Sequence, residues 1–491
     1  MLMLFNVNSL VVSDSLLRPR SLTLVLPAIL NPFVEGAPAA VITRIALDWI
    51  VGGTPLDDLF EEIAEGQYTR ELALSHLVHV MLDVASGFRP SPRAAYRRRG
   101  LELVASLSAF YRKLARTELA LPEAIVRRTA ARARKLIVAS DALMPEPIEG
   151  YAVRILDGNV MAGTEHRIAP LRTTWSAGLP GRSLAVYEPA SGLVLDLFLE
   201  EDAYCQERAL VDRVDVLPGQ LWIMDRNFCI RSLIFRIANR DASFLVRWHR
   251  TTLPFTAAGR LRSRGRCPTG EIFEQPIDVP DGRGGLHRLR RIVLKLDEPT
   301  RDGETEIVLV TNLPREVTAA RCCEAYRGRW RIEGHYQVLT DLLHCEVPGL
   351  GYPRAALFAF SMSAIAGNAL AVLKGNLRVA HGDEIAQEVS DFELVDRVAE
   401  AYPGMMIAVP PAKWPELSQR RATTVSRLLN ELASGVPVHE MFRSRRGPKK
   451  PRPKRRSGRR IHHVSNKRLL DEARRPQARM RASPSFNASR S

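Results

Sequence analysis

The stretch TAARCCEAYRGRWRIEGHYQVLTDLLHCE, residues 318–346, determines how the rest of the chain is interpreted. It contains no proline and only two glycines, so it predicts one long helix. Residues at offsets of 0, 3, 7, 11 and 14 share one helix face: Tyr326, Arg329, Glu333, Gln337 and Thr340. Apolar residues on the far side can pack inward: Ile332, Leu339, Leu342 and Leu343. The helix thus holds one carboxylate rigidly, with an arginine one turn upstream. An ordinary amphipathic helix with one glutamate is the alternative.

The chain before this helix has a strand-like period that begins at Tyr151. Five short apolar runs predict strands, in order YAVRILDGNV, RSLAVYEP, GLVLDLFLEE, GQLWIMDRNF and ASFLVRWHR. The segments AYCQERALVDRV (203–214) and CIRSLIFRIANR (229–240) predict helices between them. The order β-β-β-α-β-α-β resembles that of an RNase H-like mixed sheet with helices on both faces. Strand-like runs in residues 251–315 then predict an inserted β subdomain before the helix that carries Glu333.

Two aspartates follow strands of this predicted sheet. Asp157 ends the first run and Asp225 lies near the end of the fourth. In the RNase H-like order the first and fourth strands are neighbours, so the two carboxylates would meet, and Glu333 would join them. Three close carboxylates repel one another unless cations neutralise them, and two Mg2+ or Mn2+ ions can do so. For a single aspartate at a strand end, a turn or a helix cap is the alternative.

The spacing Y-x2-R-x3-E, with Trp330 after the arginine, resembles the signature helix of the DDE transposases of the insertion-sequence-four and transposon-five-like family. The resemblance covers about residues 151–373. It implies that Asp157, Asp225 and Glu333 are the catalytic, metal-binding triad of a magnesium-dependent endonuclease. The signature ends in a lysine seven residues after the glutamate, where this chain has Thr340.

The same resemblance implies which residues contact DNA. On the signature helix these are Tyr326, Arg329 and Trp330. Arg247 and His249 resemble a basic strand end near DNA in the family, although a solvated strand end is an equal alternative.

Charge is concentrated in one part of the chain. The chain has 491 residues and a net charge of +16. Residues 443–491 carry 18 Lys and Arg against two acids, so their net charge is also +16 and residues 1–442 are neutral overall. Few large apolar residues occur there, which predicts a disordered tail that binds DNA without sequence preference, or is simply solvated. The predicted DNA contacts in the tail are Lys449, Lys450, Lys454, Arg455 and Arg456.

Composition and periodicity divide the chain further. We expect a helical N-terminal region (1–140) that binds the transposon end, with basic helix faces at Arg97–Arg99 and Arg127–Arg134. The catalytic core would comprise residues 150–250 and 316–374, interrupted by the insertion at 251–315. A helical region (375–442) would support a homodimer, by resemblance to the family.

Other features constrain the environment of the protein. Six cysteines show no CxxC pair, which is typical of a reducing compartment, and no signal peptide is evident. The apolar window 355–373 predicts a buried helix rather than a membrane span. By resemblance we expect a prokaryotic cytoplasmic protein associated with the nucleoid.

The sequence therefore predicts an enzyme of DNA recombination. It would perform cut-and-paste transposition, nicking DNA with water and then using the freed 3′-hydroxyl for strand transfer to target DNA. A catalytically decayed DNA-binding protein derived from a transposase and another RNase H-like nuclease are the alternatives.

Overall fold

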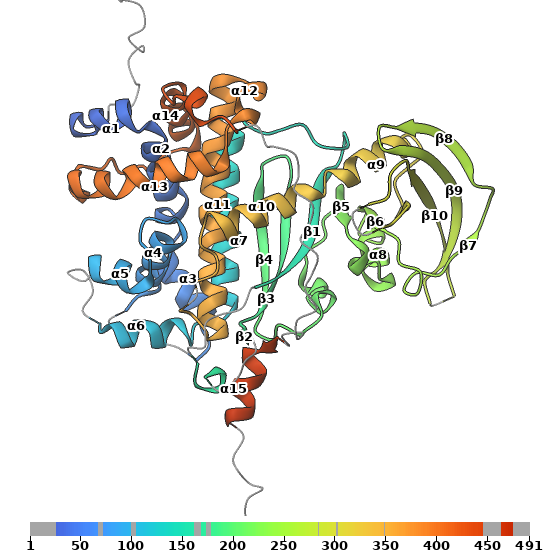
Figure 1. Ribbon diagram of the computed structural model, residues 1–491, viewed down its shortest axis with the longest axis horizontal. Helices are drawn as coiled ribbons and strands as arrows, with labels where there is room; N and C mark the ends of the chain where they lie inside the picture. The colour runs from blue at the N-terminus through green and yellow to red at the C-terminus, as the bar shows by residue number, and fades with distance from the viewer. Residues whose placement is uncertain are drawn as a thin grey trace, which may run out of the picture.

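A computed structural model describes residues 26–66, 72–99, 105–161, 168–172, 178–282, 284–300, 303–347, 349–444 and 463–474. The chain is mixed α/β: helices flank a large mixed sheet (Figure 1). Neighbouring strands follow the order β4-β3-β1-β5-β6-β11-β10-β9-β7, and β8 pairs with β9. The strands of this sheet are β1 Ala152–Val160, β3 Arg182–Glu188, β4 Leu193–Glu200, β5 Gln220–Met224, β6 Ser243–Arg247, β7 Thr256–Ala257, β8 Arg262–Cys267, β9 Gly270–Pro280, β10 Leu286–Leu296 and β11 Glu306–Thr311.

The sheet has two buried faces because its central strands are apolar on both sides. In β1, Val153 and Ile155 belong to one hydrophobic core, and Leu156, which points the other way, belongs to the second. The β1–β5 and β5–β6 pairs are parallel, while β3 pairs antiparallel with both β1 and β4. The predicted adjacency of the first and fourth strands is confirmed, since these runs form β1 and β5.

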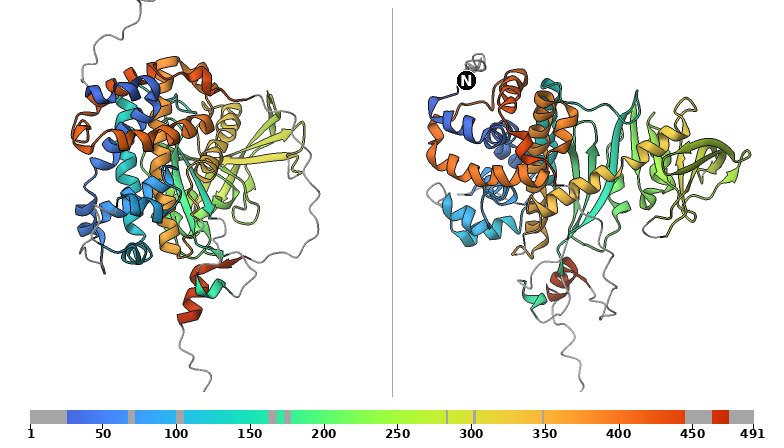
Figure 2. Two further views of the ribbon diagram at one scale, coloured as in Figure 1. Left: turned by 60° about the vertical axis from the view of Figure 1, so that its left-hand side comes forward. Right: turned by 45° about the horizontal axis from the view of Figure 1, so that its top comes forward.

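Helices form the N-terminal and C-terminal regions, as predicted, and lie together on one side of the sheet (Figure 2). Short turns aside, the helices are α1 Asn31–Gly36, α2 Pro38–Leu47, α3 Leu56–Ile63, α4 Leu74–Ala85, α5 Pro92–Arg98, α6 Leu107–Leu114, α7 Ala120–Ala139, α8 Arg231–Ala238, α9 Ala319–Arg327, α10 Trp330–Asp341, α11 Pro353–His381, α12 Asp383–Glu388, α13 Asp391–Ala408, α14 Ala422–Ser434 and α15 Asn466–Arg474.

Helix α11 lies between the helical regions and the sheet. Two helical stretches, Pro38–Ile63 and Pro353–His381, are long and apolar enough to cross a membrane; 67% and 94% of their apolar windows are buried inside the protein. The prediction of a buried helix at 355–373 is therefore confirmed. Asn368 of α11 also donates to the carbonyl of Val194 and accepts from its N–H, both at 2.9 Å, so α11 satisfies the outer backbone of edge strand β4.

The strands of residues 251–315 extend the main sheet. Strand β11 pairs antiparallel with β6, and β9 and β10 pair along eleven residues beyond it. Figure 1 shows these strands curving away from the helices at one end of the molecule.

The single helix expected over residues 318–346 was wrong in two respects. The structure contains α9 and α10, separated at Gly328 and Arg329, where Arg331 N–H bonds to the carbonyl of Gly328 three residues back rather than four. Helix α10 ends at Asp341, and His344 shortly after has a positive φ of 42°. Glycine has a low helix propensity, and the interruption falls where the Arg329 side chain turns toward the sheet.

The helix predicted at residues 203–214 was also wrong. This segment forms two 3-10 turns, η4 (Glu207–Ala209) and η5 (Val211–Arg213). Leu210 and Val214 are buried in the second core, so tertiary packing overrides the weak helical periodicity of the segment.

Part of the tail expected to be disordered is folded. Residues 463–474 form β12 (Val464–Ser465) and α15, and β12 pairs with β2 (Gly178–Leu179). Asn466 is fully buried and donates to the carbonyl of Gly351 at 2.9 Å. The composition of this segment predicted disorder because it has few apolar side chains. The segment is nevertheless ordered where its backbone pairs with β2 and its Asn466 side chain binds the folded protein. Residues 445–462 and 475–491 lie outside the described residues.

Candidate active site

The two predicted aspartates lie near the carboxyl ends of two neighbouring central strands, β1 and β5. The β1–β5 register pairs Leu156 with Met224, so Asp157 and Asp225 follow neighbouring paired positions. Asp225 leaves β5 in an extended conformation and its Oδ1 accepts the N–H of Asn227 at 2.8 Å. That contact is the turn-capping role that an isolated aspartate often has, and it leaves the second carboxylate oxygen of Asp225 for other partners.

Helix α10 crosses this edge with its predicted rotation. Ile332 and Leu339 are buried, and the Tyr336 hydroxyl donates to the carbonyl of Asp157 at 3.0 Å. The rotation turns Arg329 and Glu333 toward Asp157. Arg329 Nη2 bonds to Glu333 Oε1 at 2.7 Å, and its Nη1 lies 3.5 Å from Asp157 Oδ2. One guanidinium therefore bridges carboxylates of the strand and the helix.

The electrostatics of this edge are dominated by burial and by like charge. Burial raises the pKa of Asp157 to about 7; Arg329 opposes the shift, and Asp225, Glu333 and Glu207 add to it. Burial works against the charge of Arg329, but Tyr326, Asp157 and Glu333 raise its pKa above the usual value. A single cation is therefore shared among several carboxylates.

No group of three His, Cys, Asp or Glu side chains is close enough to hold a metal ion within the residues that the structure describes. At the candidate site, Arg329 occupies a position between two of the carboxylates that a cation could neutralise. The donor set itself, three carboxylates without sulfur or imidazole, suits hard cations such as Mg2+ and Mn2+.

The predicted DNA contacts differ in accessibility. Trp330, beside Arg329 in sequence, is 64% exposed, whereas Tyr326 is buried. Arg247 is ion-paired with Glu304, a residue of the β10–β11 loop that Arg226 also contacts. Trp330 is therefore free to contact a ligand, while Arg247 would first have to exchange its carboxylate partner.

His249 and Thr340 have local partners. The ring of His249 lies 3.1 Å and 3.2 Å from the hydroxyls of Thr251 and Thr252. Thr340, in the place of the signature lysine, donates to the carbonyl of Tyr336 at 2.9 Å. The predicted tail contacts lie outside the described residues: Lys449, Lys450, Lys454, Arg455 and Arg456.

The arginines of the basic face predicted on α7 are partly exposed, and several of them have partners within the protein. Arg127 and Arg134 pair with Asp196 of β4 and Glu188 of β3, both at 2.9 Å. Arg132 donates to the carbonyl of Trp49. These arginines therefore attach α7 to its neighbours.

Glu207 is a fourth carboxylate beside Asp157 and Asp225, and its sequence pattern did not predict this position. Its side chain accepts a hydrogen bond from Asn227 Nδ2 at 2.8 Å and lies against Gly158, the residue after Asp157. The only sequence signal is that glycine directly after the catalytic candidate, which leaves room for an incoming side chain. A segment predicted to be helical gave no reason to place Glu207 there.

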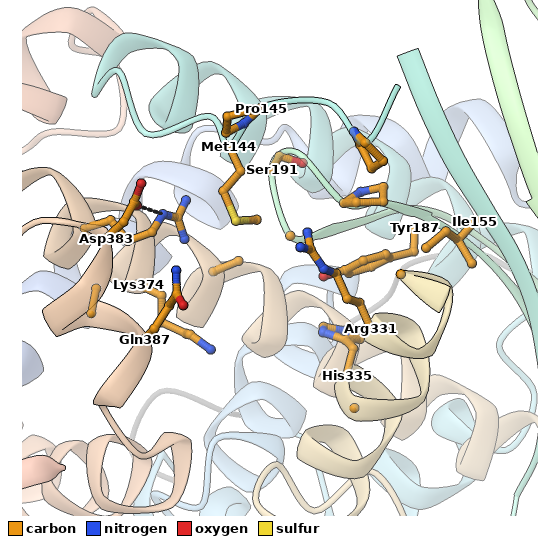
Figure 3. A pocket seen from close by; sticks show the side chains of 18 of the residues that line it. Met144, Pro145, Ile155, Tyr187, Ser191, Arg331, His335, Lys374, Asp383 and Gln387 are labelled. Carbon is orange, nitrogen blue, oxygen red and sulfur yellow. Dashed lines mark ion pairs between the residues drawn. The ribbon is translucent and has the colours of Figure 1, made fainter. Parts of the chain in front are cut away.

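A cavity of about 940 Å³ lies against the opposite face of α10. Figure 3 shows Arg331, Tyr187 and His335 on one side of it, with Lys374 and Asp383 on the other. Lys374 is paired at 2.6 Å with the first residue of α13, and Asp383 lies 3.8 Å from an arginine of α11. Burial lowers the pKa of His335 to about 4, so the imidazole is neutral at pH 7. The cavity is separate from the carboxylates, and its charges are largely compensated.

No known protein family matches this sequence, and no curated protein is similar to it. Among solved structures, the chain is similar to one in a cryo-EM structure of the piggyBac transposase synaptic complex with hairpin DNA. The identity is 12% and the TM-score 0.34, over 76% of this chain and 73% of the other. A TM-score of this size does not establish a common fold.

Proposed function

We propose that the protein is a DNA transposase of the DDE type that cuts and joins DNA by metal-dependent phosphoryl transfer. The observation that carries the proposal is the excess of carboxylates at one sheet edge. Asp157 lies within β1, Asp225 directly follows the adjacent parallel strand β5, and Arg329 bridges Asp157 and Glu333 of α10.

The strand order supports an RNase H-like core. Strands β4, β3 and β1 are antiparallel neighbours, and β5 and β6 continue in parallel beyond β1. The inserted strands follow β6, and the helix that carries the third carboxylate comes after them. The strand order agrees with that of an RNase H-like sheet, although two 3-10 turns stand in place of the helix predicted at residues 203–214.

Asp157, Asp225 and Glu333 would hold two Mg2+ or Mn2+ ions. Such ions activate a water or 3′-hydroxyl and stabilise the leaving oxygen of an in-line displacement at phosphorus. In the protein alone, Arg329 is ion-paired with both Asp157 and Glu333. A DNA phosphate is a strong bidentate partner for a guanidinium, so bound DNA would draw Arg329 from the carboxylates.

DNA would be the main partner. The 18 Lys and Arg of residues 443–491 supply sequence-independent affinity for phosphates, and exposed Trp330 offers an aromatic face beside the carboxylates. We extend the proposal to a homodimer acting on two transposon ends in a prokaryotic cytoplasm.

The proposal is tested by cleavage of a labelled duplex that carries the DNA flanking the reading frame. Wild-type protein should cleave it only with Mg2+ or Mn2+. Glu333→Gln keeps the size of the side chain but removes one charge, so cleavage should fall by at least about 10³-fold, while DNA affinity changes little. Glu324→Gln, on exposed α9 surface and paired with Arg321, is the matched control and should cleave normally.

Cleavage that survives Glu333→Gln would refute the assignment of the site. Metal-independent cleavage by the wild-type protein would refute the mechanism.

A catalytically decayed DNA-binding protein is the second candidate. The observation that favours it is Thr340, which bonds to its own helix and offers no cation. A wild-type protein that binds DNA without cleaving it, together with a Thr340→Lys variant that cleaves, would identify a decayed enzyme.

A further inference from the structure

Glu207 contacts three separate segments of the proposed active site. It begins η4, in the loop between β4 and β5, and its side chain is only 18% exposed. Oε2 accepts from Asn227 Nδ2 at 2.8 Å, and Oε1 lies 3.8 Å from Arg182 Nη1 of β3. Both carboxylate oxygens therefore have partners on elements that are distant in sequence.

The third contact depends on Gly158. A Cβ atom at this position would lie 2.3 Å from Glu207 Cδ, well inside van der Waals distance. Glu207 thus occupies the space that a side chain on β1 would fill, directly after Asp157. Any residue larger than glycine would displace it.

The contact with Asn227 continues to Asp225. The Asn227 N–H donates to Asp225 Oδ1 at 2.8 Å, while its side-chain amide donates to Glu207. A continuous chain of hydrogen bonds therefore runs from Glu207 through Asn227 to Asp225. The other end of Glu207 rests on the backbone beside Asp157.

We propose that Glu207 is a positioning residue that fixes Asp225 relative to Asp157, acting through the hydrogen bond to Asn227. The inference rests on the proposed function, because the positions of the two aspartates matter only if they share cations. Removing a group that hydrogen-bonds to a metal ligand and orients it commonly lowers the metal affinity by about 10- to 100-fold. Glu207 has the contacts expected of such a group.

Two measurements on the full-length protein without DNA test the inference. The first is Mn2+ affinity by calorimetry. Glu207→Ala and Asn227→Ala should each weaken it by about 10-fold or more, and the double variant should be little worse than either. Glu207→Gln can still accept from Asn227 and should remain within about threefold of wild type. Asp212→Asn, in the adjacent turn with a side chain 82% exposed, is the control and should have no effect.

The second measurement is hydrogen exchange of the Asn227 amide, which does not depend on metal. It should be slow in the wild type and in Glu207→Gln, and at least about tenfold faster in Glu207→Ala. Gly158→Ala should reproduce the Glu207→Ala result, because it displaces the carboxylate without changing its chemistry.

The inference is overturned if exchange in Glu207→Ala matches wild type, or if Glu207→Gln behaves like Glu207→Ala. It is also overturned if Glu207→Ala lowers the melting temperature but leaves Mn2+ affinity unchanged, since Glu207 would then only brace the fold. A wild-type protein that binds no Mn2+ while the exchange pattern holds would instead count against the proposed function, with the positional role of Glu207 intact.

Discussion

Two helix–sheet contacts in this protein are both built from arginine–carboxylate pairs. In one contact the arginines outnumber the carboxylates, and in the other the carboxylates outnumber the arginines. Helix α7 meets the sheet through Arg134, which pairs with Glu188 at 2.9 Å; Arg154 of β1 pairs with the same fully buried carboxylate at 2.9 Å. Two arginines thus serve one carboxylate. At α10, one arginine, Arg329, is shared by Asp157 and Glu333.

The difference separates a structural contact from a candidate catalytic one. At the α7 contact the buried carboxylate of Glu188 has oppositely charged partners, as a stable interior requires. At the α10 contact, Asp225 and Glu207 add further negative charge around Asp157. An excess of partly buried negative charge costs stability, and a bound cation is the ordinary way to offset it.

The largest effect is expected from a substitution that breaks the α10 contact. Asp157→Asn should lower metal-dependent cleavage by at least about 10³-fold, or about 4 kcal/mol of barrier, because one ligand charge is lost. The measurement is single-turnover cleavage at saturating Mg2+. Normal cleavage by this variant would show that the carboxylate excess has no catalytic role.

Breaking the α7 contact should affect stability instead. Glu188→Gln leaves Arg154, whose side chain is 11% exposed, without its anion, so the unfolding free energy should fall by about 3 kcal/mol. Urea denaturation measures it. The matched control is Glu62→Gln, which breaks the exposed Arg128–Glu62 pair and should cost less than about 1 kcal/mol. Equal losses in both variants would contradict the contrast drawn here.

The α10 contact should also respond to pH. The pKa of Asp157 is about 7 in the folded protein, against an ordinary value of 3.8, so the folded state binds this proton more tightly than the unfolded state does. The stability that the folded protein gains from binding this proton is fully present below about pH 4, and it is lost as the pH rises through 7. Asp157→Asn should therefore be more stable than wild type by about 2–4 kcal/mol at pH 7.5, and the gap should close at pH 4.

Denaturation of both proteins at several pH values checks this prediction. Saturating Mn2+ should narrow the gap at pH 7.5, because the cation offsets the buried charge in the wild type alone. If the difference in stability between the two proteins does not change with pH, ionisation of Asp157 does not destabilise the folded protein.

The smallest effect concerns Thr340. Thr340→Lys adds a cation two turns beyond Glu333 and should strengthen DNA binding by about 1 kcal/mol, with a steeper salt dependence. Titration of labelled DNA at two salt concentrations measures both. Unchanged affinity and slope would place residue 340 away from the bound DNA.

Local sequence determined the elements that carry the candidate site. Short apolar runs set β1 and β5; Asp157 lies within β1 and Asp225 directly follows β5. The buried stripe of Ile332 and Leu339 set the rotation of α10, and hence the direction of Glu333. Such patterns can be read from the sequence because burial on one face of an element depends only on spacing along the chain.

Tertiary structure determined the contacts that cannot be predicted from the spacing of residues along the chain. Gly328 allowed the signature helix to break, but the position of Arg329 depends on carboxylates from β1 and α10 together. Glu207 reaches the site because its segment gave up helical structure to pack against the second core, and Asn466 anchors α15 through a carbonyl more than a hundred residues away. These contacts join residues distant in sequence, and the free energy that fixes them exists only after the chain has folded.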